Sequence, residues 1–521
     1  MKKGQILHNI VITTVGFGGV GVGLAEDGRK VLVKGSVLPH STIDCSIFKV
    51  KKDYIMALPL RVVSIEPERA DQTPRCPHYS NPLISVPENY VHKNGCGGCK
   101  RQLLSYPKQL ELKTHLVNDS FRGVSYLLDL APLQDIIPSP LTYQYRNKIE
   151  FSFGKYITKA SNDRKAKGDR STQGDEQDFS HYHERQLGFH KQGSYNHVVD
   201  VDQCYLISDK LHEVYNHMKN LCKNSGLPVY DQKRHTGVLR HIVMRQGFNT
   251  DQILINLVVA NEKINSKELD IVWDTFYKTL LSDEVLRSAC TTFILTHNNT
   301  VSDAVRRSEA ETRILRGEGY IFEELKLNQA ERPVRFRISP FSFFQTNTFG
   351  AQELFSKAAS FIQLPEDKQT IMDLYCGAGT IGLSLLSQGI GKDLIGIEIV
   401  EDAIRDAKYN AELNSLSDQS YFVAGKTEAL ISTDPVIQEK IEQVGLVLVD
   451  PPREGLHKDV CVFLNELKAK YNFQLIYISC NPVTLARDLD LLVQGGRKLE
   501  NLQPVDMFPH THHVEMISVL S

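Results

Sequence analysis

The pattern of apolar and polar positions divides the chain into three parts. Residues 1–66 contain short runs of alternating apolar residues separated by turn residues, which is typical of the strands of a small β-barrel. From about Ser339 onward, short apolar runs such as TIMDLYC alternate with longer segments such as TIGLSLLSQG. This alternation of predicted strands and helices indicates a parallel, doubly wound α/β sheet of the Rossmann type.

The residues between these two parts have a mixed pattern. A cysteine-containing stretch precedes a helical pattern from Lys100 to about Val124, and predicted strands and helices are mixed over residues 140–335. A polar segment of mixed charge at about residues 157–185 predicts an exposed insertion. The chain is therefore predicted to be an α/β protein with a β-barrel over 1–66, a mixed α+β domain over 67–338 and a doubly wound domain over 339–521.

Composition narrows the class of protein. The 521 residues carry a formal net charge of −2, so any basic surface for a nucleic acid must be local. No run of about 18 apolar residues is present, and a transmembrane helix is not expected. Five glycines between Gly16 and Gly23 interrupt the apolar N-terminal stretch, which favours a β-hairpin over a secretory signal. Ten cysteines are too few for a disulfide framework, and we expect a cytoplasmic protein.

A glycine-rich loop, DLYCGAGTIG, joins a predicted strand to a predicted helix. Gly377 and Gly379 allow the backbone to turn tightly and approach a ligand, and Gly382 permits close packing of the helix. Glu398 ends the next predicted strand about twenty residues later, where its carboxylate can accept hydrogen bonds from both ribose hydroxyls. The loop therefore predicts a nucleotide-type cofactor, and its GxGxxG spacing keeps a dinucleotide as an alternative.

A second rim of the predicted cofactor site is DPPR at residues 450–453, directly after the apolar run LVLV. The two prolines make this segment rigid. Asp450 is placed to hold the ammonium group or the adenine side of a cofactor, and the alternative is that the prolines only end the strand.

The run LIYIS ends in Cys480, at the edge where an open α/β sheet presents its active site. A thiolate that adds to C6 of a pyrimidine makes C5 nucleophilic toward a methyl sulfonium, after which a base removes the C5 proton and the thiolate leaves. Cys480 and Glu515 both lie next to predicted strands and can supply nucleophile and base. The alternatives are a buried thiol, a structural carboxylate, and Cys376 as a competing nucleophile.

These motifs resemble those of the RNA 5-methyluridine methyltransferases over most of the chain. The resemblance rests on FSFFQTN at 341–347, DLYCGAGTIGL, DPPR, SCNP at 479–482, HVE at 513–515, YRNK at 145–148 and LRHIVMR. It implies Cys480 as the nucleophile and Glu515 as the base. It also implies that S-adenosylmethionine is held by Gln345, Tyr375, Glu398 and Asp450. GFGGVGVG is similar to the TRAM-type β-barrel of the family, which implies RNA binding by residues 1–66.

Four cysteines remote from this site, Cys76, Cys96, Cys99 and Cys204, resemble the ligands of a [4Fe-4S] cluster in the ribosomal-RNA branch of the family. A Cys-x2-Cys pair with two distant cysteines fits four-thiolate ligation of an iron–sulfur cluster or of zinc. Nineteen residues separate Cys76 from Cys96, many more than the family usually has. The extra residues are expected to loop out and leave the site intact.

The implied reaction constrains the substrate, because a uridine inside a stem cannot reach Cys480 and must be flipped out or lie in a loop. Candidate RNA contacts are Arg146, Lys148, Arg240, His241 and Arg245. The resemblance implies a monomeric enzyme that methylates C5 of uridine, most closely in 23S ribosomal RNA. The alternatives are a transfer-RNA methyltransferase and an RNA-binding iron–sulfur protein without activity. A cytosine-C5 methyltransferase is less favoured, because its motifs place the cysteine differently.

Overall fold

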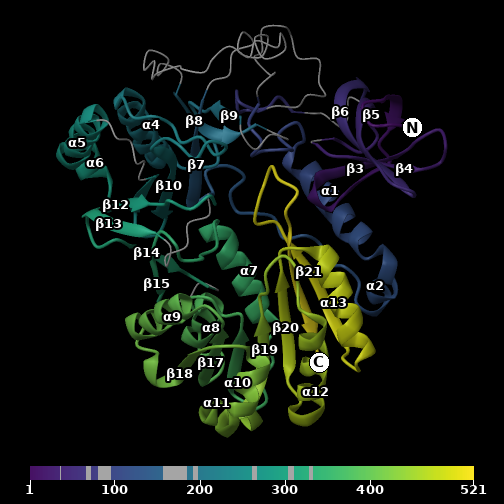
Figure 1. Cartoon of the computed structure of the whole chain (residues 1–521). Helices are drawn as coiled ribbons and strands as arrows, with labels where there is room; N and C mark the ends of the chain where they lie inside the picture. The colour runs from purple at the N-terminus through teal and green to yellow at the C-terminus, as the bar shows by residue number, and fades with distance from the viewer. Residues whose placement is uncertain are drawn as a thin grey trace.

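The computed structural model describes residues 1–35, 37–65, 72–79, 95–155, 185–191, 197–260, 267–302, 310–327 and 332–521. The polar insertion and most of the spacer between Cys76 and Cys96 lie outside these ranges. The described strands form a six-stranded N-terminal sheet, a seven-stranded central sheet, a two-stranded sheet and a seven-stranded C-terminal sheet (Figure 1). The helices in these ranges include none that is long and apolar enough to cross a membrane.

The N-terminal sheet has the strand order β1-β5-β6-β4-β3-β2. Its strands are β1 Ile6–Val11, β2 Thr14–Gly16, β3 Val20–Leu24, β4 Lys30–Val33, β5 Thr42–Val50 and β6 Tyr54–Ser64. Val31, Ile43 and Ile55 are fully buried in its apolar core. The described pairing leaves β1 and β2 as the two edges of the sheet, and the closed barrel stays a prediction.

The central part begins with the helical segment that the sequence predicted. Helices α1 (Tyr106–Ser120) and α2 (Tyr126–Leu130) precede a sheet of order β13-β12-β11-β10-β7-β8-β9. Its strands are β7 Lys148–Lys155, β8 Arg185–His190, β9 Val198–Asp200, β10 Leu239–Gly247, β11 Gln252–Val259, β12 Thr292–His297 and β13 Glu311–Arg316. The remaining elements are α4 Asp209–Asn224, α5 Lys267–Ser282, α6 Glu284–Ala289, β14 Ile321–Leu325 and β15 Val334–Ile338.

The C-terminal sheet confirms the predicted alternation of strands and helices. Strands β18, β17, β16, β19 and β20 are parallel neighbours, and β22 lies antiparallel between β20 and β21. The strands are β16 Thr370–Leu374, β17 Asp393–Glu398, β18 Ser420–Ala424, β19 Val444–Val449, β20 Gln474–Ser479, β21 Leu499–Val505 and β22 Glu515–Leu520. The helices are α7 Thr348–Ser360, α8 Thr380–Ser387, α9 Glu401–Leu413, α10 Thr427–Thr433, α11 Pro435–Lys440, α12 Lys458–Tyr471 and α13 Pro482–Gln494.

Helices cover both faces of this sheet, as expected for a doubly wound fold. Successive side chains of a strand point to opposite faces. Ile476 and Ile478 of β20 belong to one apolar core, to which α7, α8 and α9 contribute. Leu475 and Tyr477 of the same strand belong to a second core, to which α12 and α13 contribute. The face on which a residue lies therefore follows from its position in the alternation.

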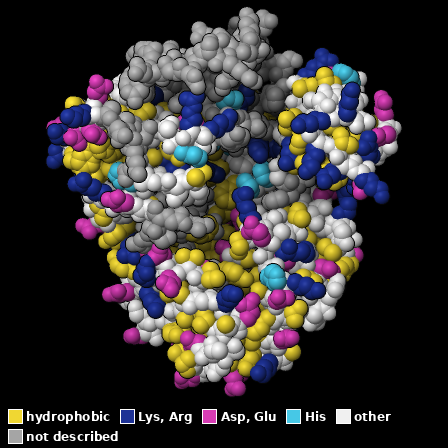
Figure 2. Space-filling model, viewed as in Figure 1, with side chains coloured by type: hydrophobic (Ala, Val, Ile, Leu, Met, Phe, Trp, Pro, Cys, Tyr) yellow, Lys and Arg dark blue, Asp and Glu magenta, His cyan; other side chains and the backbone are white. Residues whose placement is uncertain are grey.

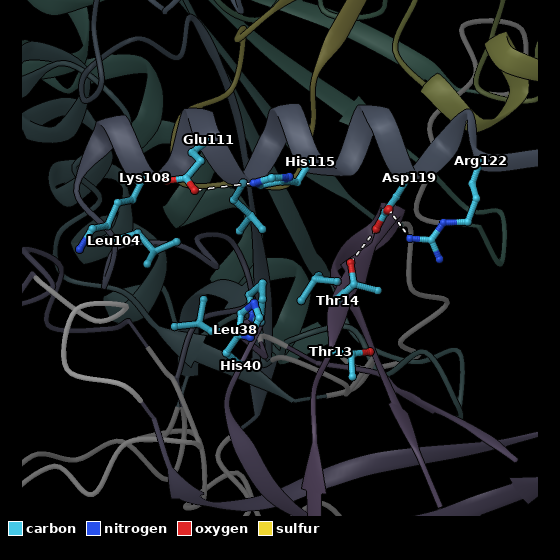
Figure 3. Close-up of a pocket in the computed structure, with 13 residues that line it drawn as sticks. Thr13, Thr14, Leu38, His40, Leu104, Lys108, Glu111, His115, Asp119 and Arg122 are labelled. Atoms are coloured by element: carbon cyan, nitrogen blue, oxygen red, sulfur yellow. Dashed lines mark hydrogen bonds and ion pairs between the residues drawn. The ribbon is translucent and has the colours of Figure 1, made fainter. Parts of the chain in front are cut away.

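Helix α1 connects the N-terminal sheet to the C-terminal part. Its Leu116 is buried in the core of the N-terminal sheet, whereas Val117 and Phe121 are buried in the core that α12 and α13 share with the C-terminal sheet. Thr14 of β2 donates a hydrogen bond of 2.6 Å to Asp119 of α1. A groove of about 600 Å³ runs between α1 and the N-terminal sheet, with charged side chains of α1 on one wall (Figure 3).

Candidate active site

The loop after β16 bends through three residues with positive φ. Tyr375, Gly377 and Gly379 have φ values of 63°, 54° and 76°. The two glycines adopt this left-handed backbone conformation without strain. Gly382 in α8 is required by packing, because a Cβ atom there would lie 2.8 Å from a carboxylate oxygen of Asp373. The backbone of this loop can therefore approach a ligand closely, as the sequence predicted.

Three carboxylates meet at the C-terminal edge of the sheet: Asp373 in β16, Glu398 at the end of β17 and Asp450 directly after β19. Glu398 accepts hydrogen bonds from the amides of Gly377 (3.3 Å) and Val400 (3.0 Å). Burial raises the pKa of Asp373 and of Asp450 to about 7, and the charges of Asp450 and Glu398 add to the rise at Asp373. No cation of the described residues pairs with Asp450, so a cationic ligand with ribose hydroxyls fits this edge.

Gln345 lies on the segment that leads into α7. Asn147, just before β7, donates hydrogen bonds from its side chain to the carbonyl of Gln345 (2.8 Å) and to the hydroxyl of Thr348 (2.9 Å). Asn347 is fully buried and donates to the carbonyl of Met507 (2.9 Å). The central part therefore fixes the Gln345 segment, and that segment is tied in turn to the loop before β22.

Cys480 and Glu515 are neighbours across two antiparallel strands. The last registered pair of the two strands is Ser479 with Met516, and one step further along this register Cys480 lies opposite Glu515. The charge of Glu515 acts on the Cys480 thiol, as expected for such neighbours. Each lies two residues from a side chain of the core shared with α7, α8 and α9, namely Ile478 and Ile517. Alternation along β22 therefore directs Glu515 to the face of Ile517, and Cys480 is the first residue after β20. The structure thus places near each other the two residues that the sequence proposed as a pair.

Burial controls the protonation of this pair. It raises the pKa of Cys480 to about 11, with further contributions from Glu515 and Asp450. It raises the pKa of Glu515 to about 8, with a further contribution from Asp450. The positive charge of Arg453 opposes both shifts, and Lys113 also opposes the shift of Glu515. At neutral pH the free protein therefore keeps a proton on most of the Cys480 thiol and on much of Glu515.

Arg453 is a residue of the site whose role the sequence did not indicate. Its carbonyl accepts hydrogen bonds from the side chains of Asn481 (2.9 Å) and Thr484 (3.2 Å) at the start of α13. Because Asn481 directly follows Cys480, the DPPR segment is bonded to the loop that carries the thiol. The prolines of DPPR predicted a rigid rim, but only the folded chain places this charge beside Cys480.

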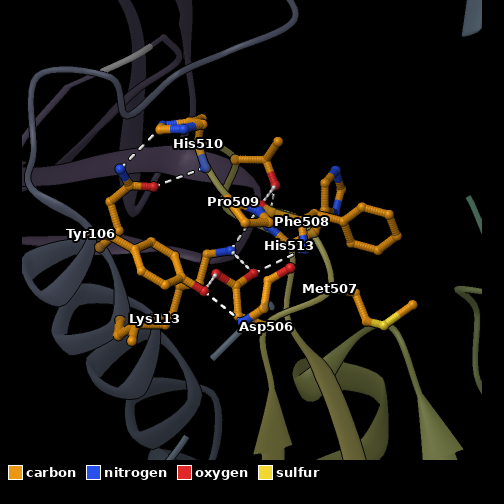
Figure 4. A network of polar contacts seen from close by, with 12 residues as sticks. Tyr106, Lys113, Asp506, Met507, Phe508, Pro509, His510 and His513 are labelled. Atoms are coloured by element: carbon orange, nitrogen blue, oxygen red, sulfur yellow. Dashed lines mark hydrogen bonds and ion pairs between the residues drawn. The ribbon is translucent and has the colours of Figure 1, made fainter. Parts of the chain in front are cut away.

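A buried ion pair holds the loop that leads to Glu515 (Figure 4). Lys113 Nζ of α1 lies 2.6 Å from a carboxylate oxygen of Asp506, and the two side chains are 1% and 0% exposed. Lys113 also donates to the carbonyl of Phe508 (2.9 Å), and the hydroxyl of Tyr106 donates to Asp506 (3.0 Å). These bonds fix both the path of the loop and the entry of β22.

The four remote cysteines line one cavity of about 300 Å³. Cys76, Cys96 and Cys99 precede α1 in the chain, and Cys204 follows β9. Burial raises the pKa of Cys96 to about 12 and that of Cys204 to about 11. Four thiols around one cavity are the donor set of an iron–sulfur cluster or of zinc. Within the described ranges, however, no three potential ligands are arranged to hold a metal ion, so the metal stays a prediction.

The prediction that Arg240, His241 and Arg245 contact RNA is wrong. All three lie in β10 and are only 2–4% exposed. The guanidinium of Arg240 donates to three backbone carbonyls between residues 298 and 302, and that of Arg245 donates to the carbonyl of Ser342 (2.5 Å). Strand β10 lies inside the central sheet and is buried along its whole length, so these charges serve the fold.

Comparison with known proteins gives matches over the whole chain. A family model described as tRNA (uracil-5-)-methyltransferase matches residues 264–521. A protein of Caldanaerobacter subterraneus described as an uncharacterized RNA methyltransferase is 33% identical, over 100% of this chain and 99% of its own. A protein of Chlorobaculum tepidum with the same description is 31% identical, over 99% of this chain and 96% of its own. The Pyrococcus abyssi tRNA (uracil-54, C5)-methyltransferase, solved with S-adenosyl-L-homocysteine, has the same fold, with a TM-score of 0.64, 24% identity and 99% coverage of both chains.

We expect Glu515→Gln to lower the pKa of Cys480, because it removes a negative charge beside the thiol and keeps the shape of the side chain. At about pH 9, above the pKa of Glu515 and below that of Cys480, iodoacetamide should alkylate Cys480 faster in the variant than in the wild type. Mass spectrometry of the Cys480 peptide measures the rate. Glu500→Gln, an exposed carboxylate in β21, is the control, and equal rates in all three proteins would contradict the assigned interaction.

Proposed function

The chain belongs to the RNA 5-methyluridine methyltransferase family, and we propose that Cys480 and Glu515 carry out its transfer of a methyl group from S-adenosylmethionine to C5 of a uridine. The observation that carries this assignment is the register of β20 and β22, which makes the thiol and the carboxylate neighbours. They lie at the sheet edge where Asp373, Glu398 and Asp450 gather. A nucleophile, a base and a site for a cationic cofactor are thus combined at one edge.

In the proposed reaction, the thiol of Cys480 loses its proton to solvent, the thiolate forms a bond to C6 of the uracil, and the C5–C6 π electrons move onto C5 and O4. With S-adenosylmethionine bound, C5 would bond to the methyl carbon while the bond from that carbon to the sulfonium sulfur breaks, which would leave a neutral thioether. The carboxylate of Glu515 removes the C5 proton, the C5–C6 double bond forms again, and the bond between C6 and sulfur breaks. Only the ionised form of Glu515 can take this proton. Because its pKa is raised to about 8, that form is a stronger base than an ordinary carboxylate, which suits this step.

Gln345, Tyr375, Glu398 and Asp450 are the proposed contacts of S-adenosylmethionine, which supplies an electrophilic methyl group on a sulfonium. Glu398 ends β17, where a carboxylate suits the ribose hydroxyls. Asp450 lacks an ion-pair partner among the described residues, and an ammonium group would offset the cost of burying its charge. The loop at Tyr375 gives the backbone close access to the adenosine.

RNA is the proposed partner of the N-terminal sheet as well as of the catalytic edge. Residues 1–66 contain nine lysines and arginines but five carboxylates, a net charge of +4 in a chain whose formal net charge is −2. Such local basic charge attracts phosphate groups. This supports a TRAM-type role in RNA binding for residues 1–66. The target uridine would leave its stack to reach Cys480, and we propose that the enzyme acts in the cytoplasm as a monomer.

Large-subunit (23S) ribosomal RNA is the proposed substrate. The basic N-terminal sheet and the cavity lined by four cysteines support this choice, because both resemble features of the ribosomal-RNA branch. Transfer RNA is the second candidate. It is favoured by the description of the matching family model and by the substrate named for the Pyrococcus abyssi protein.

Cys76, Cys96, Cys99 and Cys204 are the proposed ligands of a [4Fe-4S] cluster, and zinc is the alternative. The shared cavity and the all-thiol donor set support this proposal. A cluster there would cross-link the segment before α1 to the segment after β9. Its proposed role is structural, because methyl transfer from a sulfonium requires no electron from a metal.

We expect Cys480→Ala to abolish methyl transfer to RNA. Glu515→Gln should still add to RNA but should release it slowly, because no base removes the C5 proton. A covalent complex of RNA and protein should therefore accumulate in the Glu515→Gln variant and resist denaturing electrophoresis. Wild-type turnover by Cys480→Ala would contradict the assignment of Cys480 as the nucleophile. Absence of a trapped complex with Glu515→Gln would contradict the assignment of Glu515 as the base.

Protein purified without oxygen should be brown and should contain iron and acid-labile sulfide. Replacing Cys96 by serine should remove the colour, because serine is a poor ligand for iron in such a cluster. Cys222→Ser is the matched control, since this buried thiol lies in α4 and does not line the cavity. Colourless protein that contains one zinc ion would favour the alternative metal, and active protein without any metal would refute both.

A strain that lacks this gene should lose 5-methyluridine at one or more positions of 23S ribosomal RNA. Mass-spectrometric mapping of ribosomal and transfer RNA from the deletion strain and its parent measures the loss. Complementation with the wild-type gene should restore the methyl group, and the Cys480→Ala gene should not. Loss in transfer RNA alone would establish the second candidate substrate.

A further inference from the structure

Three cations surround the loop between β21 and β22 without forming an ion pair. They are Lys100, just before α1, Arg146, just before β7, and Arg453 after β19. None of the three has a carboxylate within ion-pair distance among the described residues. Lys113, which contacts the same loop, differs because its charge is matched by Asp506 at 2.6 Å.

Hydrogen bonds bring the segments of Lys100 and Arg146 to the loop between β21 and β22, and that of Arg453 to the residues that follow Cys480. The amide of Lys100 donates to the carbonyl of His510 (2.8 Å). Tyr145, which is fully buried, donates from its hydroxyl to the carbonyl of Pro509 (3.0 Å) and so fixes the position of Arg146. Arg453 is bonded through its carbonyl to the residues that follow Cys480. Three segments that are distant in sequence thus present their charges around one loop.

The histidines of this loop add no charge of their own. His512 and His513 stack with ring centroids 4.1 Å apart. Burial lowers the pKa of His513 to about 3, and the charges of Arg453, Lys113, Lys100 and Arg146 lower it further. His512 is affected in the same way, with burial and its neighbour His513 as the leading causes. Arg453 also faces Glu515, and Arg146 also lines the cavity of the four cysteines. No carboxylate of the described residues forms an ion pair with Lys100, Arg146 or Arg453, so the loop meets more positive charge than these residues pair.

Unmatched cations that converge on one place attract an anion, because their mutual repulsion falls when a negative charge enters. Figure 2 shows a hollow near the centre of the molecular face, with Lys or Arg and His side chains at its rim. The anion that an RNA methyltransferase brings to its catalytic residues is the phosphodiester backbone. Arginine can bind phosphate with two parallel hydrogen bonds and lysine as a point charge.

We propose that Lys100, Arg146 and Arg453 bind the phosphate groups that flank the target uridine, and so hold the backbone while the base enters the site. This inference rests on the proposed function, because it assumes an RNA substrate at Cys480. It assigns the three cations to the RNA backbone, which gives affinity without sequence information. Contacts with the bases, made by other residues, would then determine which uridine is methylated.

The salt dependence of binding tests this site. The probe is a labelled transcript that contains the uridine identified by the deletion strain, bound in the presence of S-adenosylhomocysteine so that no turnover occurs. Lys100→Gln, Arg146→Gln and Arg453→Gln should each reduce the steepness of log Kobs against log salt by about 0.7–0.9, and the triple variant by about 2.1–2.7. Each should also weaken binding at low salt.

Lys470→Gln is the matched control, since Lys470 is exposed at the end of α12, at the sheet edge opposite Cys480. Its slope should equal that of the wild type. The exchanges Lys100→Arg, Arg146→Lys and Arg453→Lys should restore the wild-type slope, which separates charge from packing. Binding of S-adenosylhomocysteine confirms that each variant is folded.

A triple variant with the wild-type slope would overturn the phosphate site. So would a reduced slope that the charge-conserving exchanges do not restore, because the effect would then be structural. These results differ from a failure of the proposed function. A protein that methylates no RNA refutes the function itself, whereas one that methylates RNA with an unchanged slope refutes only the assignment of the three cations.

Discussion

The buried contact between Lys113 and Asp506 is the constraint on which the arrangement of this protein depends. Both side chains are excluded from solvent, and breaking a buried pair by removing one partner typically costs about 3–5 kcal/mol. Asp506 begins the loop that ends at Glu515, and α1, which carries Lys113, also packs on the N-terminal sheet through Leu116. The position of Glu515, the proposed base, is therefore linked to a helix that supports two other parts of the chain.

Electrostatics divide the active site into two sides. Carboxylates at the ends of β16, β17 and β19 form a negative side suited to a cationic cofactor, and cations from three other segments surround the loop before β22. Cys480 and Glu515 lie where the two sides meet. Negative neighbours and burial raise the pKa of both groups, and Arg453 acts against these shifts. This separation of charge suits a cationic cofactor on the side of the carboxylates and an anionic substrate on the side of the cations.

The basic strand motifs show where inference from sequence failed. YRNK and LRHIVMR have similar alternation of basic and apolar residues, and both predicted contacts with RNA. The structure separates them. Arg240 and Arg245 lie inside the central sheet and bond to backbone carbonyls, whereas Arg146 stands beside the active-site loop. The order of the strands in the sheet decides whether such arginines are buried or exposed. The alternation of side chains along a single strand does not reveal which other strands and helices will pack against it.

Local chemistry was readable from the sequence alone. The sequence places the glycine loop after β16, the acid at the end of β17 and the cysteine after β20. The rule that parallel sheets bind ligands at the ends of their strands made these residues candidates for the site. The register that pairs Cys480 with Glu515, the contact of Lys113 with Asp506 393 residues away, and the position of Arg453 were decided only by the tertiary structure. The reason is physical: patterns along the chain fix the direction of each side chain within its own strand or helix, whereas contacts between distant segments depend on how those elements pack.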